Sequence, residues 1–159
     1  ADGRHEIRFT LRGCSSTIKP KISGTSSSKG GNYTPQPPGS VIVPSDFSGA
    51  VYLTGEHCGK TGDACQSVQL TFVADPTETN RHYINYSALP GQKFLFPVTA
   101  KFDDDDDDAS NADSYQDPDD VIECQSYECQ DASRDPDDFI SNRIYSSTKG
   151  VGVDIIYDC

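Results

Sequence analysis

Apolar and polar residues alternate along several short segments of this chain. In segment 5–12, Ile7, Phe9 and Leu11 are apolar, and polar residues stand between them. Successive side chains of a β-strand point to opposite faces of its sheet, so this period of two predicts a strand with one buried face. No long segment has the apolar period of an α-helix. The pattern therefore predicts a chain built from β-strands.

Similar segments recur along the chain, separated by Gly, Pro and Ser. The predicted strands are 5–12, 40–43, 50–53, 67–73, 82–86, 94–102 and 151–157. Residues 24–39 are rich in Ser, Gly and Pro and predict a loop. Short strands with such breaks are typical of an antiparallel β-sandwich. With 159 residues, we expect one all-β domain that spans residues 1–159.

The negative charge is concentrated in one stretch. Lys and Arg number 13 and Asp and Glu number 25, which gives a formal net charge of -12 at pH 7. Residues 103–138 hold sixteen of these acids and one base, so the remainder of the chain is slightly basic. Neighbouring carboxylates repel one another and favour solvent, which predicts an acidic, loop-rich insert at 103–138. We expect no nucleic-acid partner, because binding nucleic acid needs a basic surface. We also expect no membrane span, because a span needs a long apolar segment.

Six consecutive aspartates open this insert. They are Asp103, Asp104, Asp105, Asp106, Asp107 and Asp108. We expect a solvated loop here. The alternative is a Ca²⁺ site, since Ca²⁺ takes about six to eight oxygen ligands. The spacing of an EF-hand loop is absent, so any Ca²⁺ would bind weakly, and we expect no other cofactor.

A short repeat lies within the insert. The sequence Asp-Pro-Asp-Asp-Val-Ile at 117–122 recurs as Asp-Pro-Asp-Asp-Phe-Ile at 135–140. Asp caps helix N-termini, Pro fits the first helical position, and acids stabilise the positive end of a helix. The repeat predicts one or two short helical turns, near 118–123 and 136–141.

Cysteine usage indicates an oxidising compartment. The six cysteines are Cys14, Cys58, Cys65, Cys124, Cys129 and Cys159. An even number in a chain without Met or Trp is typical of a disulfide-bonded secreted protein, and the spacings are not those of a zinc site. Spacing alone does not decide which cysteines pair.

Two N-glycosylation sequons support the same compartment. They begin at Asn32 and Asn85, which we expect to carry glycans. We therefore expect a secreted, extracellular glycoprotein in its mature form, from which a signal peptide has been removed.

Several motifs follow one another in a recognisable order. A first strand ends in Cys14, a strand pair leads to Cys58, and a short loop reaches Cys65 before another strand. Segment 83–97 is similar to a Tyr-Asp-x-Ser motif that is followed by Gly-Phe-x-x-Pro. Segment 129–132 is similar to the motif Cys-x-Asp-Ala, and the last strand ends in a cysteine, as the first one does. This order resembles the thaumatin-like protein family, most closely its short fungal members. The resemblance covers most of the chain outside 20–38 and 103–123.

The resemblance implies a disulfide pattern. Cys14 would pair with Cys159, joining the first strand to the last, and Cys58 with Cys65. The remaining two cysteines, Cys124 and Cys129, would form the third bridge. The large cysteine-rich domain of the bigger family members is absent, and the acidic insert takes its place in chain order.

The resemblance also implies a polysaccharide-binding cleft that has lost its acids. At the positions similar to a cleft Glu and Asp, this chain has Gln69 and Asn85. Amides hydrogen-bond sugars but do not exchange protons at neutral pH, and glycoside hydrolysis needs two carboxyl groups. We therefore expect Gln69, Tyr83 and Asn85 to bind carbohydrate, and no catalytic residue. His5 and His82 lie in predicted strands, where a structural role is expected.

Two functions of different classes follow, and in both we expect a protein that binds or assembles rather than an enzyme. The first is a non-catalytic, secreted thaumatin-like glycoprotein that binds cell-wall polysaccharide of β-glucan type, with a defence or antimicrobial role. The alternative is a structural matrix or filament-forming glycoprotein that self-associates through edge strands and the acidic loop. A weak β-1,3-glucanase is the second alternative.

Overall fold

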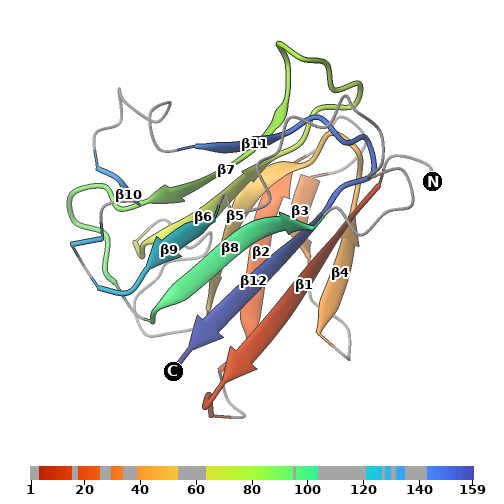
Figure 1. Cartoon of the computed structure of the whole chain (residues 1–159). Helices are drawn as coiled ribbons and strands as arrows, with labels where there is room; N and C mark the ends of the chain where they lie inside the picture. Colours follow the sequence, from red (N-terminus) through yellow and green to blue (C-terminus); the bar gives the residue numbers. More distant parts are fainter. Residues whose placement is uncertain are drawn as a thin grey trace.

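The computed structural model places twelve strands in two sheets that pack face to face (Figure 1). It describes residues 4–15, 18–25, 30–33, 39–53, 64–94, 96–103, 121–126, 128–129, 132–134 and 143–159. Among these residues no helix is present. No helix in this part of the chain could therefore cross a membrane.

The first sheet has five strands and lies in front in Figure 1. Its strands, in spatial order, are β4 (Ser40–Val43), β1 (His5–Arg12), β12 (Gly152–Asp158), β8 (Val98–Asp103) and β9 (Ile122–Cys124). The first and last long strands of the chain, β1 and β12, are therefore neighbours in the middle of this sheet.

The second sheet has seven strands. Its main path runs β10 (Ala132–Ser133), β7 (His82–Ser87), β6 (Ser67–Thr71), β5 (Ser48–Leu53), β2 (Pro20–Thr25) and β3 (Gly30–Tyr33). The seventh strand, β11 (Ile144–Ser146), pairs with β7 beside β10.

This arrangement confirms the all-β sandwich and changes several details. The sheets are mixed rather than purely antiparallel, because β1 pairs with β12, and β10 with β7, in parallel. Residues 30–33 form β3 inside the segment predicted as a loop. The helical turn predicted near 118–123 is wrong at its C-terminal end, where β9 begins at Ile122. The turn predicted near 136–141 lies outside the described residues.

A single apolar cluster fills the space between the sheets. Strand β1 contributes Ile7 and Phe9, and β12 contributes Val153 and Ile155, all on alternate positions. The facing sheet supplies its own alternate residues, among them Leu70 from β6. Burial of each such side chain stabilises the fold by about 1.5–3 kcal/mol. The alternation seen in the sequence is thus the alternation between core and outer face.

A pair of glycines lets β2 and β5 approach closely. Gly24 and Gly49 are opposite one another, and the fully buried ring of Phe47 covers both. A Cβ on Gly49 would lie 2.7 Å from the tip of that ring and 2.4 Å from the Ser23 carbonyl oxygen. Gly49 is therefore a packing position inside β5, whereas the sequence predicted it to be a break between strands.

The two ends of the chain are joined covalently beside the β1–β12 pair. Cys14 and Cys159 form a disulfide with a Cα–Cα distance of 4.8 Å across a sequence separation of 145 residues. This confirms the pairing that the family resemblance implied. Parallel neighbours need a long connection, and here almost the whole chain provides it.

Two buried histidines lie at the other end of β1. The ring of His5 stacks on Phe72 at a centroid distance of 3.8 Å, and His82 meets the His5 ring edge-on at 4.8 Å. The His82 Nδ1 accepts a hydrogen bond from the Val73 N–H, so its Nε2–H donates to the Thr148 carbonyl. These contacts describe a neutral His82 and agree with the structural role expected for both histidines.

The terminal disulfide should contribute more stability than the short one. Chain-entropy models assign a bridge that closes about 145 residues roughly 5 kcal/mol, and one that closes about six residues roughly 2 kcal/mol. We expect the double variant Cys14→Ser/Cys159→Ser to lose more free energy of unfolding in chemical denaturation than Cys124→Ser/Cys129→Ser. Equal losses would contradict a head-to-tail constraint on the unfolded chain.

The histidine pair should make stability depend on pH. Burial, with a smaller contribution from the nearby His5, lowers the pKa of His82 from 6.5 to about 4. The unfolded chain then binds more protons between these values, so stability is complete above about pH 6.5 and falls as the pH approaches 4. The loss should be on the order of 3 kcal/mol. Denaturation of wild type and His82→Gln across this range measures it, and parallel profiles for the two proteins would refute this assignment.

Candidate functional site

The three predicted carbohydrate-binding residues lie on one face of the seven-stranded sheet. Gln69 of β6 and Asn85 of β7 are directly opposite one another, and Tyr83 is two positions along β7. The residues between them, including Leu70 and Ile84, point into the core. Alternation therefore places all three on the outer face of this sheet, away from the core.

The side chain of Asn85 is buried and forms a hydrogen bond within the protein. Its side chain is 2% exposed, and its Oδ1 accepts a hydrogen bond of 2.7 Å from the Ser133 hydroxyl of β10. This burial opposes both direct sugar contact and glycan attachment at Asn85, because each needs the amide at the surface. Asn32 lies in β3, where side chains are not described, and its glycosylation stays a prediction.

Three residues that the sequence analysis missed surround Tyr83. Strand β11 places Tyr145 directly opposite Tyr83, with ring centroids 6.3 Å apart and nearly edge-on. The Arg143 guanidinium carbon lies 3.9 Å from the centre of the Tyr83 ring. The Arg81 guanidinium carbon lies 4.3 Å from the centre of the Tyr145 ring. We call Arg81, Tyr83, Arg143 and Tyr145 the tyrosine–arginine cluster.

The two arginines of this cluster carry charges that the described chain does not neutralise. Among the described residues, no carboxylate lies within ion-pair distance of Arg81 or Arg143. The Nε of Arg143 is also buried and has no hydrogen-bond partner in this part of the protein. All four side chains of the cluster are half-buried, so each keeps some contact with solvent.

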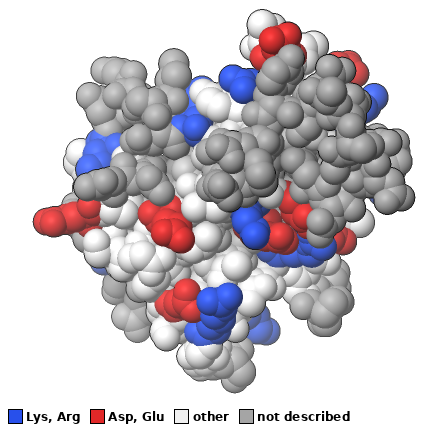
Figure 2. Space-filling model, viewed as in Figure 1, with Lys and Arg blue, Asp and Glu red and all other residues white. Residues whose placement is uncertain are grey.

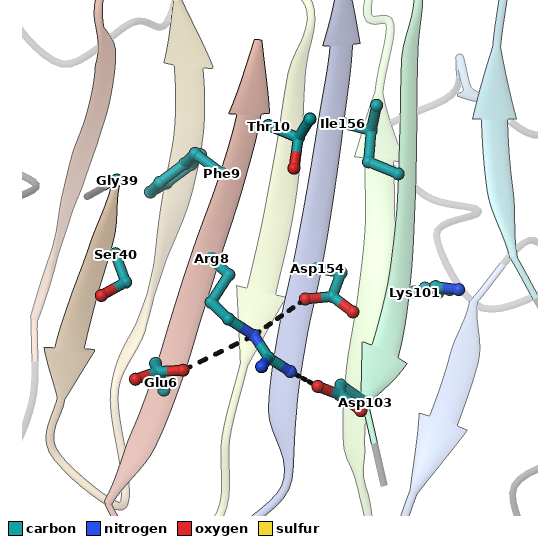
Figure 3. A pocket seen from close by; sticks show the side chains of 10 residues that line it. All are labelled: Glu6, Arg8, Phe9, Thr10, Gly39, Ser40, Lys101, Asp103, Asp154 and Ile156. Carbon is teal, nitrogen blue, oxygen red and sulfur yellow. Dashed lines mark hydrogen bonds and ion pairs between the residues drawn. The ribbon is translucent and has the colours of Figure 1, made fainter. Parts of the chain in front are cut away.

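A hollow lies on the outer face of the other sheet, which has five strands (Figure 3). It has a volume of about 590 Å³ and is lined by Glu6, Arg8, Phe9, Thr10, Gly39, Ser40, Lys101, Asp103, Asp154 and Ile156. The hollow therefore spans β4, β1, β12 and β8.

Arg8 is the centre of this hollow. Its Nε lies 3.0 Å from the Asp154 Oδ1 and 3.5 Å from the Glu6 Oε1, and its Nη2 forms an ion pair with Asp103 (Figure 3). The Asp103 side chain is only 10% exposed. Asp103 is thus an ion-paired residue at the end of β8, whereas the sequence predicted it to belong to a solvated loop. Residues 104–108 lie outside the described residues.

The described acids do not gather into a metal site. No group of three or more His, Cys, Asp or Glu side chains in the described ranges is arranged to hold a metal ion. Figure 2 shows acidic and basic residues beside one another on the face that it presents. Weak Ca²⁺ binding by the aspartate run stays a prediction.

The remaining cysteines are oxidised where the structure describes them. Cys124 pairs with Cys129 at a Cα–Cα distance of 5.0 Å, as the resemblance implied. Cys65 is disulfide-bonded, and its expected partner, Cys58, lies outside the described residues.

Solved structures that are similar to this chain exist. No family model matches the chain, and no curated protein matches it. A solved thaumatin-like xylanase inhibitor, TLXI, is similar with 13% sequence identity and a TM-score of 0.49. The likeness covers 95% of this chain and 97% of the inhibitor. At this identity and TM-score the likeness says nothing of family, ligand or activity.

The hydrogen bond between Ser133 and Asn85 should make a measurable contribution to the free energy of unfolding. In Ser133→Ala the buried Oδ1 of Asn85 loses its donor, which should lower the free energy of unfolding by about 1–3 kcal/mol. The exposed Ser48 provides a matched control, and Ser48→Ala should change stability by less than about 0.5 kcal/mol. Chemical denaturation compares the two variants, and equal effects would show that the Asn85 contact contributes nothing.

Proposed function

We propose that this chain is a secreted, non-catalytic, thaumatin-like glycoprotein that binds cell-wall polysaccharide of β-glucan type and acts in defence. The binding surface is the outer face of the seven-stranded sheet. The observation that supports this proposal is the tyrosine–arginine cluster, in which two tyrosine rings from neighbouring strands lie together on a sheet face.

The chemistry of this face suits a sugar polymer. Tyrosine combines an apolar ring, on which the C–H face of a sugar can stack, with a hydroxyl that hydrogen-bonds. Gln69 is half-buried on the next strand and adds an amide that both donates and accepts. Thr71, which is opposite Tyr83, adds a hydroxyl. Side chains on strands move little, so the face is organised before the ligand arrives.

Three further observations support an extracellular, non-catalytic role. Disulfides persist in oxidising compartments, and two bridges are formed between described cysteines. On the proposed face, amides stand where acids would be needed for hydrolysis. In the hollow of the five-stranded sheet, Arg8 binds both Asp103 and Asp154, whereas a glycosidase acid must be free to give a proton to its substrate.

One observation favours self-association as a second candidate function. Among the described strands, β4 lies at the edge of its sheet and pairs with β1 alone, and its Ile42 is 53% exposed. An edge strand with an apolar side chain can pair with another copy of the chain. Size-exclusion chromatography of wild type and Ile42→Lys tests this candidate, and a monomer in both cases would reject it.

Substitution of the two tyrosines should weaken polysaccharide binding. We expect Tyr83→Ala and Tyr145→Ala each to reduce retention on insoluble β-glucan about five- to tenfold, because an aromatic contact of about 1 kcal/mol or more is lost. Thr10→Ala, on the outer face of the other sheet, is the control and should bind as wild type does. Circular dichroism confirms that each variant is folded.

Two outcomes would reject the proposal. Wild type that is not retained on any cell-wall polysaccharide at low salt would remove the binding function. Release of reducing sugar from laminarin by the purified chain would show an enzyme instead.

A further inference from the structure

We propose that the tyrosine–arginine cluster recognises acidic sugars, so that the preferred ligand is a polysaccharide that carries uronate carboxylates. This inference rests on one part of the proposed function, that this face binds cell-wall polysaccharide, and it replaces the neutral β-glucan of that proposal with an acidic polymer as the preferred ligand. It concerns Arg81 and Arg143, whose charges a neutral glucan would leave uncompensated.

The contacts of Arg81 and Arg143 with the tyrosine rings leave the charges of both guanidinium groups available to a ligand. Arg143 lies over the Tyr83 ring at 3.9 Å and Arg81 over the Tyr145 ring at 4.3 Å. A cation–π contact is an attraction to the ring as a whole, and it leaves the net charge of the guanidinium in place. Each arginine is therefore held beside a tyrosine ring without an ion pair to a described acid.

Three other described cations, by contrast, form ion pairs with acids of the chain. Arg8 contacts three carboxylates, Arg12 lies 3.9 Å from Asp158, and Lys149 lies 3.9 Å from Asp75. No carboxylate among the described residues lies within ion-pair distance of Arg81 or Arg143. In a chain with a formal net charge of -12, acids are abundant, and yet none of those described serves this cluster.

Arg143 also has an unsatisfied donor. Its Nε is buried and lacks a hydrogen-bond partner in the described chain. A buried donor without an acceptor costs about 1–3 kcal/mol. Because this Nε is closed to solvent, a ligand would reach Arg143 through the part of its side chain that stays exposed. A carboxylate is the acceptor that fits a guanidinium in two parallel hydrogen bonds.

The neighbouring side chains favour a sugar over other anions. A small inorganic anion would use the arginines and leave the tyrosine rings, Gln69 and Thr71 without a role. A uronate residue presents a carboxylate, hydroxyl groups and an apolar C–H face together, which matches guanidinium, amide and aromatic ring respectively.

The overall negative charge of the chain restricts where such a polymer can bind. Sixteen of the 25 acids lie in 103–138, and the remainder of the chain is slightly basic. At about 0.15 M salt the screening length is about 8 Å, so only acids close to the cluster weaken its attraction for an anion. Among the described residues, no carboxylate lies within ion-pair distance of Arg81 or Arg143. Binding should therefore depend on the two arginines rather than on net charge.

Affinity measurements with two polymers test the inference. Polygalacturonate is the acidic probe and laminarin the neutral one, and both are measured with the intact chain by isothermal titration calorimetry at physiological salt. We expect tighter binding to polygalacturonate, and about a tenfold loss for this polymer alone in Arg81→Gln and in Arg143→Gln. Arg143→Lys should recover only part of the loss, since it keeps the charge without the planar fork. Arg12→Gln is the matched control and should bind as wild type does.

The outcomes separate this inference from the proposed function. Laminarin binding that equals or exceeds polygalacturonate binding would overturn the inference and leave the proposed function standing. Polygalacturonate binding that Arg12→Gln weakens as much as Arg143→Gln does would also overturn it, because nonspecific attraction would then explain the affinity. Failure to bind either polymer would remove the proposed function and the inference together.

Discussion

The pairing of β1 with β12 is the constraint on which the rest of the structure depends. Residues from Ile7 to Arg12 pair in parallel with Val153 to Asp158, so the sheet closes only when both ends of the chain have come together. Cys14 and Cys159 then fix this arrangement covalently. The cost is a large loss of chain entropy before the contact forms, which apolar burial on the inner faces of both strands offsets. This strand pair supports two further features. His5, at the start of β1, contacts the Val151 carbonyl, and Arg8, in the middle of β1, contacts Asp154.

Much of the fold follows from local pattern, and what was missed is non-local. Alternation gave β1 its observed bounds and identified Ile7 and Phe9 on its core face. It could not show that the first and last strands are parallel neighbours, because a strand carries no mark of its partner. It also missed β10 and β11, whose two and three residues are too few to show a period. Those two strands form beside β7 because the existing sheet edge offers hydrogen bonds to them.

The candidate site was predicted only in part, again because contacts between strands that are far apart in the sequence cannot be read from a local pattern. The sequence placed Gln69, Tyr83 and Asn85 together, and the sheet register brings them to one face. It did not foresee that Ser133 would engage Asn85, nor that Tyr145 would lie opposite Tyr83, because both partners come from the short strands. Asp103 shows the converse error, since its neighbours in sequence suggested solvent while its neighbour in space is Arg8. Side chains on a sheet face are defined by cross-strand partners, which composition does not reveal.

Arginine has different partners on the outer faces of the two sheets, and this difference indicates which face is the better candidate for binding a ligand. On the five-stranded sheet the charge of Arg8 is balanced by three acids from β1, β8 and β12, so its attraction for an outside anion is largely spent within the fold. On the seven-stranded sheet, the contacts that the described residues offer to Arg81 and Arg143 are the π-faces of Tyr145 and Tyr83. A cation–π contact orients a guanidinium but leaves its net charge in place. Binding energy is available where interactions are incomplete, and for that reason the seven-stranded face is the stronger candidate for recognition.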